Sequence, residues 1–317
     1  MIGSAPLRGM SLADRLRHFL LDPEGAEVAL EFSSAALVGA RVETRGGKTE
    51  LRALSTEALS EDALRPTLED PGFVRKEELR DAVKRILAKI GASPGIRAAL
   101  VVPDVVARFR LFAQDEVKAD PKKRDALLAF RMQKLLPFPA GDTRVISVWP
   151  RSPSEPVLAV GFSGPVLSAY EHVGQAFGLD IGSVETSSMA LLRGIQVEGD
   201  ALLVRHDPAW LTLTLVRNGW PMSIRTFDGA VAGRPEEVRR EIASTAVFWR
   251  DRLSGATLAG AVVHASDRSF EHLSADIGSC FECEVERAKP PAHLVVAGLP
   301  AVVERSAAPA LALLGAY

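Results

Sequence analysis

The sequence predicts an α/β protein built from two similar lobes that face each other across a cleft. The chain has 317 residues, which is long enough for two separate hydrophobic cores. Each half opens with a pattern of three strands, followed by an amphipathic helix and a further strand. A repeated β-β-β-α-β order indicates two mixed sheets covered by helices. We expect the first lobe at residues 1–196 and the second at residues 197–317.

The first lobe is expected to begin with a three-stranded meander. The strands are predicted at residues 26–32, 36–44 and 48–54, with a turn at Gly46 and Gly47 between the last two. The helix that follows has one apolar stripe, made of Leu79, Val83, Ile86, Leu87 and Ile90, and ends at Gly91. Residues 97–102 are mostly apolar, which is typical of a central strand buried on both faces.

Residues 104–163 are predicted to form a small subdomain inserted in the first lobe. We expect it to contain a strand at 105–112, a helix at 121–136 and strands near 144–149 and 156–163. The helix must stop at Pro137 and Pro139, because proline lacks the amide that would continue it. The lobe then continues with a helix at 165–177, a strand at 179–184 and a short helix at 187–195.

The second lobe repeats the opening meander and then alternates helices and strands. Asn218-Gly219 predicts a tight hairpin, because both residues tolerate positive φ, and Asp207-Pro208 predicts the other turn. The strands are expected at residues 201–206, 209–217 and 221–227. The remaining elements are predicted as a helix at 235–253, a strand at 259–264, a helix at 268–277, a strand at 281–286 and a helix near 305–315.

Composition excludes several classes of protein. The 38 lysine and arginine residues against 40 acidic ones give a net charge of −2, so there is no basic excess of the kind that binds nucleic acid. Two cysteines in this length fit a reducing compartment. No run approaches the roughly 20 apolar residues of a membrane-spanning helix, and the start lacks a signal-peptide pattern. We therefore expect a cytoplasmic protein.

An apolar stripe near the start, at Leu12, Leu16, Phe19 and Leu20, predicts a short amphipathic helix. This helix would either fold back onto its own domain or contact a membrane surface or a partner helix. The sequence leaves both alternatives open.

Several segments, in their order and spacing, resemble one family. Residues 130–139, FRMQKLLPFP, are similar to an E-x-Q-x-Y-I-P-F-P element, and residues 100–103 precede it as expected. Further similar pieces are residues 177–179 with 190–193, residues 215–221, and residues 237–242. These segments resemble PilM, the cytoplasmic actin-like family of type IV pilus assembly, and more distantly the cytoplasmic part of the type II secretion protein GspL. The resemblance implies an actin-like fold with two RNase H-like βββαβα lobes.

The resemblance also implies a nucleotide site between the lobes, and this chain departs from it. Such a site needs two glycine-bearing hairpin tips for the phosphates, with an acidic residue beside each tip for Mg²⁺. The first tip maps onto residues 30–37, where Glu31 stands at the acidic position and Ser33 and Ser34 replace glycine. The second tip maps onto residues 204–210.

The residues of the second tip disfavour Mg·ATP binding more strongly than those of the first. Arg205 stands at the acidic position, Asp207 stands at the glycine, and Pro208 removes one backbone donor. The adenosine turn maps onto residues 263–268, which contain no glycine, and the loop at 228–233 is too short for the family's helical segment. We therefore predict a degenerate nucleotide site formed by Glu31, Ser33, Ser34, Arg205 and Asp207, with no cofactor and no catalytic residue.

No metal site is predicted either. Cys280 and Cys283 form a C-x-x-C motif without the second pair of cysteines that a zinc site needs. His206-Asp207 resembles a metal dyad, but the other histidines have no ligand spacing, and an aspartate that caps a turn explains the pair better.

The resemblance implies a non-catalytic scaffold peripheral to the inner membrane. Its partners would be the short cytoplasmic tail of a PilN-like membrane protein and other inner-membrane components of the pilus or secretion apparatus. We expect the tail to contact an apolar groove at Phe109, Leu111, Leu135, Leu136, Pro137 and Phe138. The same side chains would alternatively only seal the core of the inserted subdomain. Two other functions remain open at this stage, a diverged actin-like ATP-binding protein and a GspL-like type II secretion module.

Overall fold

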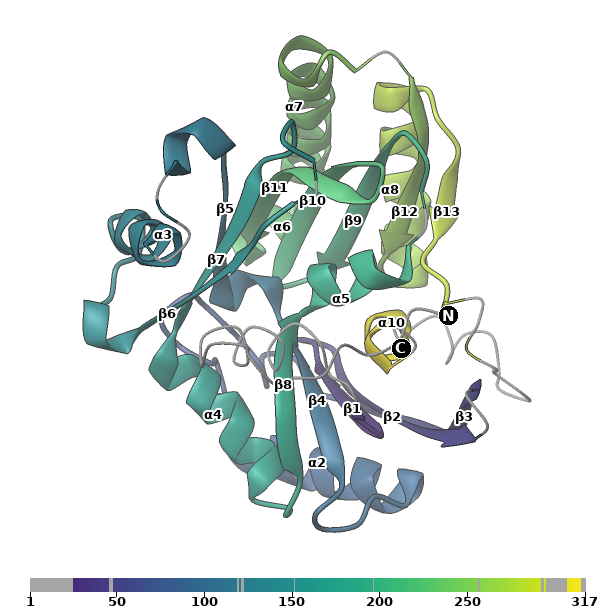
Figure 1. The fold of residues 1–317 in the computed structure, drawn as a ribbon. Helices are drawn as coiled ribbons and strands as arrows, with labels where there is room; N and C mark the ends of the chain where they lie inside the picture. Colours follow the sequence, from purple (N-terminus) through teal and green to yellow (C-terminus); the bar gives the residue numbers. More distant parts are fainter. Residues whose placement is uncertain are drawn as a thin grey trace.

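A computed structural model gives the fold (Figure 1). It describes residues 25–45, 48–118, 120, 123–150, 152–195, 197–255, 257–291, 294 and 307–314. The amphipathic helix expected near residues 12–20 and the turn at residues 46–47 lie outside the described residues. Within the described part of the chain, no helix is both long and apolar enough to cross a bilayer.

The first lobe contains a mixed sheet of five strands in the order β3-β2-β1-β4-β8. Its strands are β1 (Val28–Phe32), β2 (Ala36–Arg45), β3 (Lys48–Ala58), β4 (Arg97–Val102) and β8 (Asp180–Thr186). β1, β2 and β3 form the expected antiparallel meander, and β4 runs parallel to both β1 and β8. Helices α2 (Lys76–Ile90) and α4 (Gly164–Gln175) share one core with this sheet.

The second lobe repeats this topology in a sheet of order β11-β10-β9-β12-β13. Its strands are β9 (Asp200–Asp207), β10 (Trp210–Arg217), β11 (Trp220–Asp228), β12 (Leu258–His264) and β13 (Val285–Arg287). Helices α7 (Pro235–Leu253) and α8 (Asp267–Phe281) pack on one face of the sheet. The predicted two-lobed α/β fold is therefore confirmed.

The inserted subdomain is a three-stranded antiparallel sheet with one helix on it. The strands β5 (Ala107–Phe112), β6 (Thr143–Val148) and β7 (Val157–Ser163) have the order β5-β7-β6. One face packs on α3 (Arg124–Gln133), and the other face joins the core of the first lobe. In Figure 1, α3 lies at the outer edge of the molecule, beyond β6 and β7. Three short 3₁₀ turns connect these elements, η1 (Asp104–Val106), η2 (Gln114–Val117) and η3 (Ala140–Asp142).

Helix α10 (Ala308–Leu314) is the last described element and packs on the first lobe. It contacts β1, β2 and β4 as well as α5 (Ser187–Gly194), on the sheet face opposite α2. Ala308 also shares a small core with Leu203 of β9. The division of the chain at residues 196 and 197 stays a prediction, since α10 follows the second lobe in sequence but packs mainly on the first.

Several elements differ from their expected bounds. The strand expected at 48–54 continues to Ala58 in β3, and the helix expected at 121–136 is limited to Arg124–Gln133 in α3. Helix α8 continues to Phe281, so β13 begins at Val285 and the strand expected at 281–286 is wrong at its start. Leu273, Ile277 and Phe281 recur every four residues and are all buried, which extends the apolar stripe of the helix by one turn. The segment at residues 228–233, expected as a short loop, contains the four-residue helix α6 (Gly229–Ala232).

Candidate functional site

The candidate site lies where the carboxyl ends of the central strands of both sheets meet. Glu31 is near the end of β1, Asp104 follows β4, and Ser187 follows β8. Arg205 and Asp207 are at the end of β9. Ligands of open α/β sheets bind beyond the carboxyl ends of the strands, so this is the place where the fold favours a site.

A buried ion pair joins the two lobes at this point. Arg205 Nη2 is 3.6 Å from Glu31 Oε1, and the two side chains are only 3% and 2% exposed. Glu31 Oε2 also accepts a hydrogen bond from the backbone N–H of Ala310 in α10, at 3.3 Å. Three parts of the chain that are far apart in sequence therefore converge on one carboxyl group.

Burial raises the pKa of the Glu31 carboxyl from 4.5 to about 7. The charge of Arg205 and the N–H of Ala310 act against this rise, whereas Asp207 and Asp104 add to it. The site thus gathers three carboxyl groups around one guanidinium group.

Arg205 is held by several further contacts. Its Nε donates to Ser187 Oγ at 2.7 Å, and its Nη1 donates to the carbonyl of His206 at 2.8 Å. The guanidinium carbon is 5.4 Å from the ring centroid of Trp210, a cation–π distance. Because Arg205 is buried and bonded on several sides, its orientation is fixed toward the first lobe.

Asp207 links the two hairpin tips. Its Oδ2 accepts the backbone N–H of Ser34 at 3.1 Å, from the tip between β1 and β2. Its Oδ1 accepts the N–H of Ala209 at 2.9 Å, from its own tip, and the hydroxyl of Ser34. The carboxylate therefore receives backbone donors from both tips at once.

Ser33 does not join this contact. Its hydroxyl donates to the carbonyl of Ala36 at 2.7 Å and accepts the N–H of Ala36 at 3.1 Å. It fixes the turn between β1 and β2 and leaves Ser34 to reach the second lobe. Four of the five residues expected at the degenerate site are thus brought together, and the fifth shapes the tip.

The sequence reasoning missed Asp104. This residue is fully buried, and its carboxylate accepts the N–H of Ser188 at 2.8 Å and the hydroxyl of the same serine. Burial raises the pKa of Asp104, while the hydrogen bonds from Ser188 lower it. Its position two residues after the end of the buried parallel strand β4 was the available signal, because such positions line the sheet edge where sites form.

A cavity of about 680 Å³ lies beside the two tips. Ser34, Ala35, Pro208 and Ala209 line one part of it, and segments near residues 59–67 and 228–229 line the rest. Its wall includes Glu61, Asp62 and Asp228, and Arg65 is paired with Asp62. The backbone N–H groups of Ser34 and Ala209 are already bonded to Asp207, so these two donors are not available to a ligand.

Within the described part of the chain, no group of three or more histidine, cysteine, aspartate or glutamate side chains is arranged to hold a metal ion. Cys280 lies in α8 and Cys283 follows that helix, and burial raises the pKa of both thiols. His206 faces away from the lobe interface, toward the carbonyl of Ala232, and burial lowers its pKa.

The six residues expected to form the groove do not share one surface. Phe109 and Leu111 pack toward the first-lobe core, whereas Leu136 and Phe138 belong to the core under α3. Leu135 is 45% exposed, and Pro137 is exposed beside it. Phe109 also lines a cavity of about 440 Å³ between β5 and β11, together with Leu68, Ile224 and Phe227.

Comparisons with solved structures identify the fold. No protein-family model matches the sequence, and no curated protein matches it. A chain of the PilM-PilN type IV pilus biogenesis complex superposes with a TM-score of 0.75 and 13% identity, over 91% of this chain and 97% of that one. A Bacteroides thetaiotaomicron protein with an actin-like ATPase fold and unknown function gives a TM-score of 0.50 and 7% identity, over 84% and 93% of the two chains.

The chain has an actin-like fold. A third solved structure, the cytoplasmic domain of EpsL from the type II secretion system of Vibrio cholerae, gives a TM-score of 0.47 and 11% identity, over 75% of this chain and 81% of that one. In the actin-like arrangement of two hairpin tips between two lobes, this chain has its own carboxylate, Asp207, bonded to both tips. Its own cation, Arg205, lies among the carboxyl groups of Glu31, Asp104 and Asp207.

Proposed function

We propose that this protein is a non-catalytic scaffold of type IV pilus assembly, a pseudo-ATPase that holds the short cytoplasmic tail of a PilN-like membrane protein. One observation carries the non-catalytic part of the proposal. The carboxylate of Asp207 accepts backbone N–H groups from both hairpin tips, at 3.1 Å from Ser34 and 2.9 Å from Ala209. Backbone N–H groups of this kind would otherwise bind the phosphates of a nucleotide.

The charges of the site support the same proposal. A nucleotide would have to displace Asp207 and place its phosphates beside the carboxyl groups of Glu31 and Asp104. A magnesium ion would have to take the space of Arg205, whose guanidinium already lies at an ion-pair distance from Glu31. Pro208 at the second tip has no N–H to offer in compensation. An internal anion and an internal cation thus oppose both components of Mg·ATP.

The breadth of the structural likeness supports the choice of partner. The similarity to a chain of the PilM-PilN complex extends over 91% of this chain, more than the two lobes would account for without the inserted subdomain. We therefore propose a PilN-like tail as the ligand and a position peripheral to the inner membrane, with other inner-membrane pilus components nearby.

We propose that the tail lies along β5, beside Phe109 and Leu111. β5 and β11 are both edge strands of their sheets, and the two strands lie next to each other. An edge strand has unpaired backbone groups that bind an extended peptide, and apolar side chains beside it select the sequence. Phe109, Ile224 and Phe227 supply such side chains around the cavity between these strands.

The nucleotide part is tested by titrating the purified protein with ATP and Mg²⁺, using calorimetry and thermal unfolding. We expect no Mg²⁺-dependent change in stability. A ligand that binds only the folded state at a hundredfold excess over its dissociation constant would add about 2.7 kcal/mol. A clear Mg²⁺-dependent rise in the native protein would contradict the proposal and favour the diverged ATP-binding alternative. The double substitution Arg205→Asp and Asp207→Gly serves as the comparison, because it puts an acidic residue in place of the internal cation and a glycine in place of the carboxylate at the second tip.

The partner is tested with a synthetic peptide that has the sequence of the cytoplasmic tail of the PilN-like protein from the same genome. We expect binding by fluorescence anisotropy, and about tenfold weaker binding after Phe109→Asp or after Arg108→Glu, which changes an exposed residue at the same cavity. Val247→Asp, at an exposed position on α7, is the matched control and should change nothing. Equal affinity in all variants, or preference for a tail from a type II secretion protein, would overturn the assignment.

A further inference from the structure

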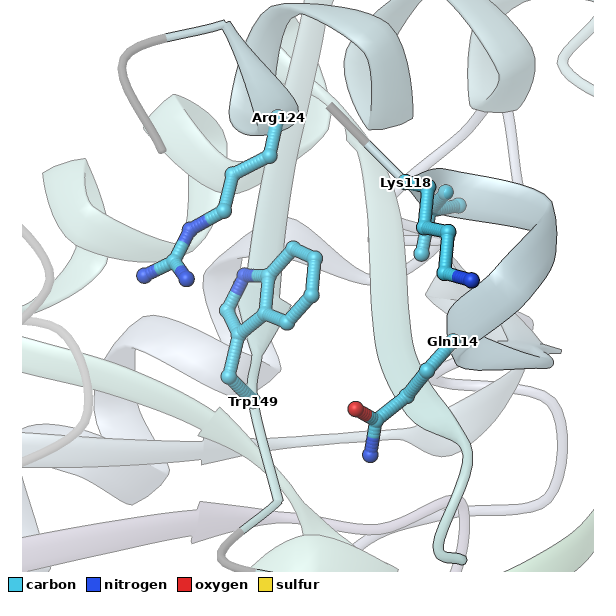
Figure 2. Close-up of a pocket in the computed structure, with 5 residues that line it drawn as sticks. Gln114, Lys118, Arg124 and Trp149 are labelled. Atoms are coloured by element: carbon cyan, nitrogen blue, oxygen red, sulfur yellow. The ribbon is translucent and has the colours of Figure 1, made fainter. Parts of the chain in front are cut away.

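A second pocket lies in the inserted subdomain, away from the interface between the lobes. It has a volume of about 520 Å³, in the range of about 300–1,000 Å³ that is usual for ligand sites. Gln114, Val117, Lys118, Arg124 and Trp149 line it (Figure 2). These residues come from η2 and the residue after it, from the start of α3, and from the residue that follows β6.

Arg124 and Trp149 form a fixed wall of this pocket. The guanidinium carbon of Arg124 is 4.3 Å from the centroid of the indole ring, a close cation–π contact. Asp125 holds the ring from its edge, since its Oδ1 accepts the indole N–H at 3.4 Å and the Ser147 hydroxyl at 2.8 Å. In Figure 2 the indole stands between Arg124 on one side and Lys118 and Gln114 on the other.

Among the described residues, neither Lys118 nor Arg124 forms an ion pair. Arg124 Nε is buried and has no hydrogen-bond partner among the described residues, although guanidinium groups bind carboxylates strongly. No carboxylate is among the residues that line the pocket, and neighbouring Glu116 is paired with Arg131 at 3.5 Å. Residues 118–134 contain six basic and two acidic residues, a net charge of +4 in a chain whose net charge is −2.

Gln114 adds an acceptor of fixed orientation. Its amide nitrogen donates to the carbonyls of Ser152 and Glu155, both at 2.8 Å, which assigns the nitrogen and leaves Oε1 on the other side. The pocket therefore offers cationic donors, one amide acceptor and an aromatic ring. A peptide with acidic side chains satisfies all three, because it brings carboxylates together with backbone N–H groups. Phosphate groups alone bring chiefly acceptors.

We propose that this pocket binds an acidic segment of a partner protein. Carboxylate side chains of the segment bind at Lys118 and Arg124, a backbone N–H donates to Gln114 Oε1, and the chain lies against Trp149. Recognition of acidic motifs by grouped cations is a recurrent mode of peptide binding. The pocket shares no lining residue with the cavity beside the hairpin tips or with the cavity between β5 and β11, so it serves a second partner.

The test uses the full-length protein and a capped, fluorescently labelled hexaglutamate peptide. We expect binding that weakens as the salt concentration rises, since the charges are partly exposed. Arg124→Gln and Lys118→Gln should each weaken it about tenfold. Arg131→Gln is the matched control, because it removes one positive charge from the same helix but from a side chain that faces Glu116 and Phe112.

Every outcome of this test bears on the proposal. Absence of hexaglutamate binding, or equal losses in the Arg124, Lys118 and Arg131 variants, would overturn it, because the attraction would then be absent or nonspecific. A capped hexaglutamine peptide should not bind. Vesicles with anionic phospholipid, and inorganic phosphate, are titrated in parallel, and binding of either without hexaglutamate binding would overturn the peptide assignment. Lys118 is exposed, so its substitution tests the site even if Arg124→Gln disturbs the Trp149 contact.

Discussion

Arg205 and Asp207 are two residues apart on β9, so their side chains leave the strand on the same face. Leu203 precedes them on this face, which is directed toward the first lobe and α10. His206 points to the opposite face and contacts the carbonyl of Ala232. The alternation of a single strand therefore places a cation and an anion side by side at the interface between the lobes.

Glu31 gives the first prediction, which concerns the pH dependence of stability. Its pKa is about 7 in the folded protein, above the ordinary value of 4.5. The folded state therefore holds a proton that the unfolded state has lost, and stability falls as the pH rises from about 4.5 to about 7. Glu31→Gln removes this loss. We expect the variant to gain on the order of 3 kcal/mol relative to the native protein between pH 4.5 and pH 8.

Denaturant unfolding of both proteins across this pH range measures the gain. Glu57→Gln is a control of opposite sign, because hydrogen bonds from Lys89 and Arg85 lower the pKa of Glu57. The stability that Glu57 contributes is present at neutral pH and is lost as the pH falls through the pKa of Glu57 in the folded protein. Glu57→Gln should therefore be less stable than the native protein at neutral pH, and this difference should disappear in acid. The prediction would be contradicted if the free energies of unfolding of Glu31→Gln and of the native protein differed by the same amount at every pH.

At the scale of elements, the inserted sheet has two different faces. Along β5 half-buried Phe109 and Leu111 alternate with exposed Arg108 and Arg110. Phe109 and Leu111 face the first lobe, whereas Phe112 faces α3. Leu136 and Phe138 follow α3 and fold back under it, where Gly161 of β7 leaves room for Leu136. A Cβ at Gly161 would be 2.8 Å from Leu136 Cδ1, which is too close. Leu136 is thus a core residue.

The second prediction separates the core and surface roles of two adjacent leucines. Leu136 is 8% exposed and Leu135 is 45% exposed. Leu136→Ala should reduce the free energy of unfolding by about 2–4 kcal/mol, because it leaves a cavity. Leu135→Ala should change it by less than about 0.5 kcal/mol. Chemical denaturation measures both values, and equal effects would show that the segment after α3 does not pack as described.

Local patterns predicted most of the elements. Asn218 and Gly219 both have positive φ, at 51° and 78°, which confirms the hairpin turn. The stripe expected on α2 is buried at every predicted position, and Gly91 ends the helix with φ 67°. The end of α8 was missed because a short apolar segment next to a helix fits either a further turn or a strand.

Local sequence patterns also predicted part of the site. Glu31, Ser34, Arg205 and Asp207 could be named from their places on strand ends and hairpin tips. Their mutual bonds depend on how the two lobes close on each other, which no local pattern encodes. Asp104 was missed because an aspartate after a proline resembles an ordinary turn residue. Whether the groove residues line a groove or seal a core was left open, because the segment with Leu136 and Phe138 after α3 follows neither a helical nor a strand period.

At the scale of the whole molecule, α10 closes the fold. Its side chains are buried against β1 and β2 and against α5, although more than 200 residues separate it from those strands. Its backbone also reaches the site, through the N–H of Ala310 that Glu31 accepts. The first lobe is therefore incomplete until the chain has passed through the second lobe. Contacts of such long sequence separation couple the two lobes in folding.

The third prediction follows from this coupling. Leu311 in α10 is fully buried, so Leu311→Ala should destabilise the protein by about 2–5 kcal/mol. Since α10, Arg205 and Asp207 all join the two lobes, we expect calorimetry to show one unfolding transition that moves to lower temperature as a whole. Val247→Ala, at an exposed position on α7, should leave that transition in place. Two transitions, with only one of them shifted by Leu311→Ala, would mean that the lobes unfold independently and that α10 stabilises the first lobe alone.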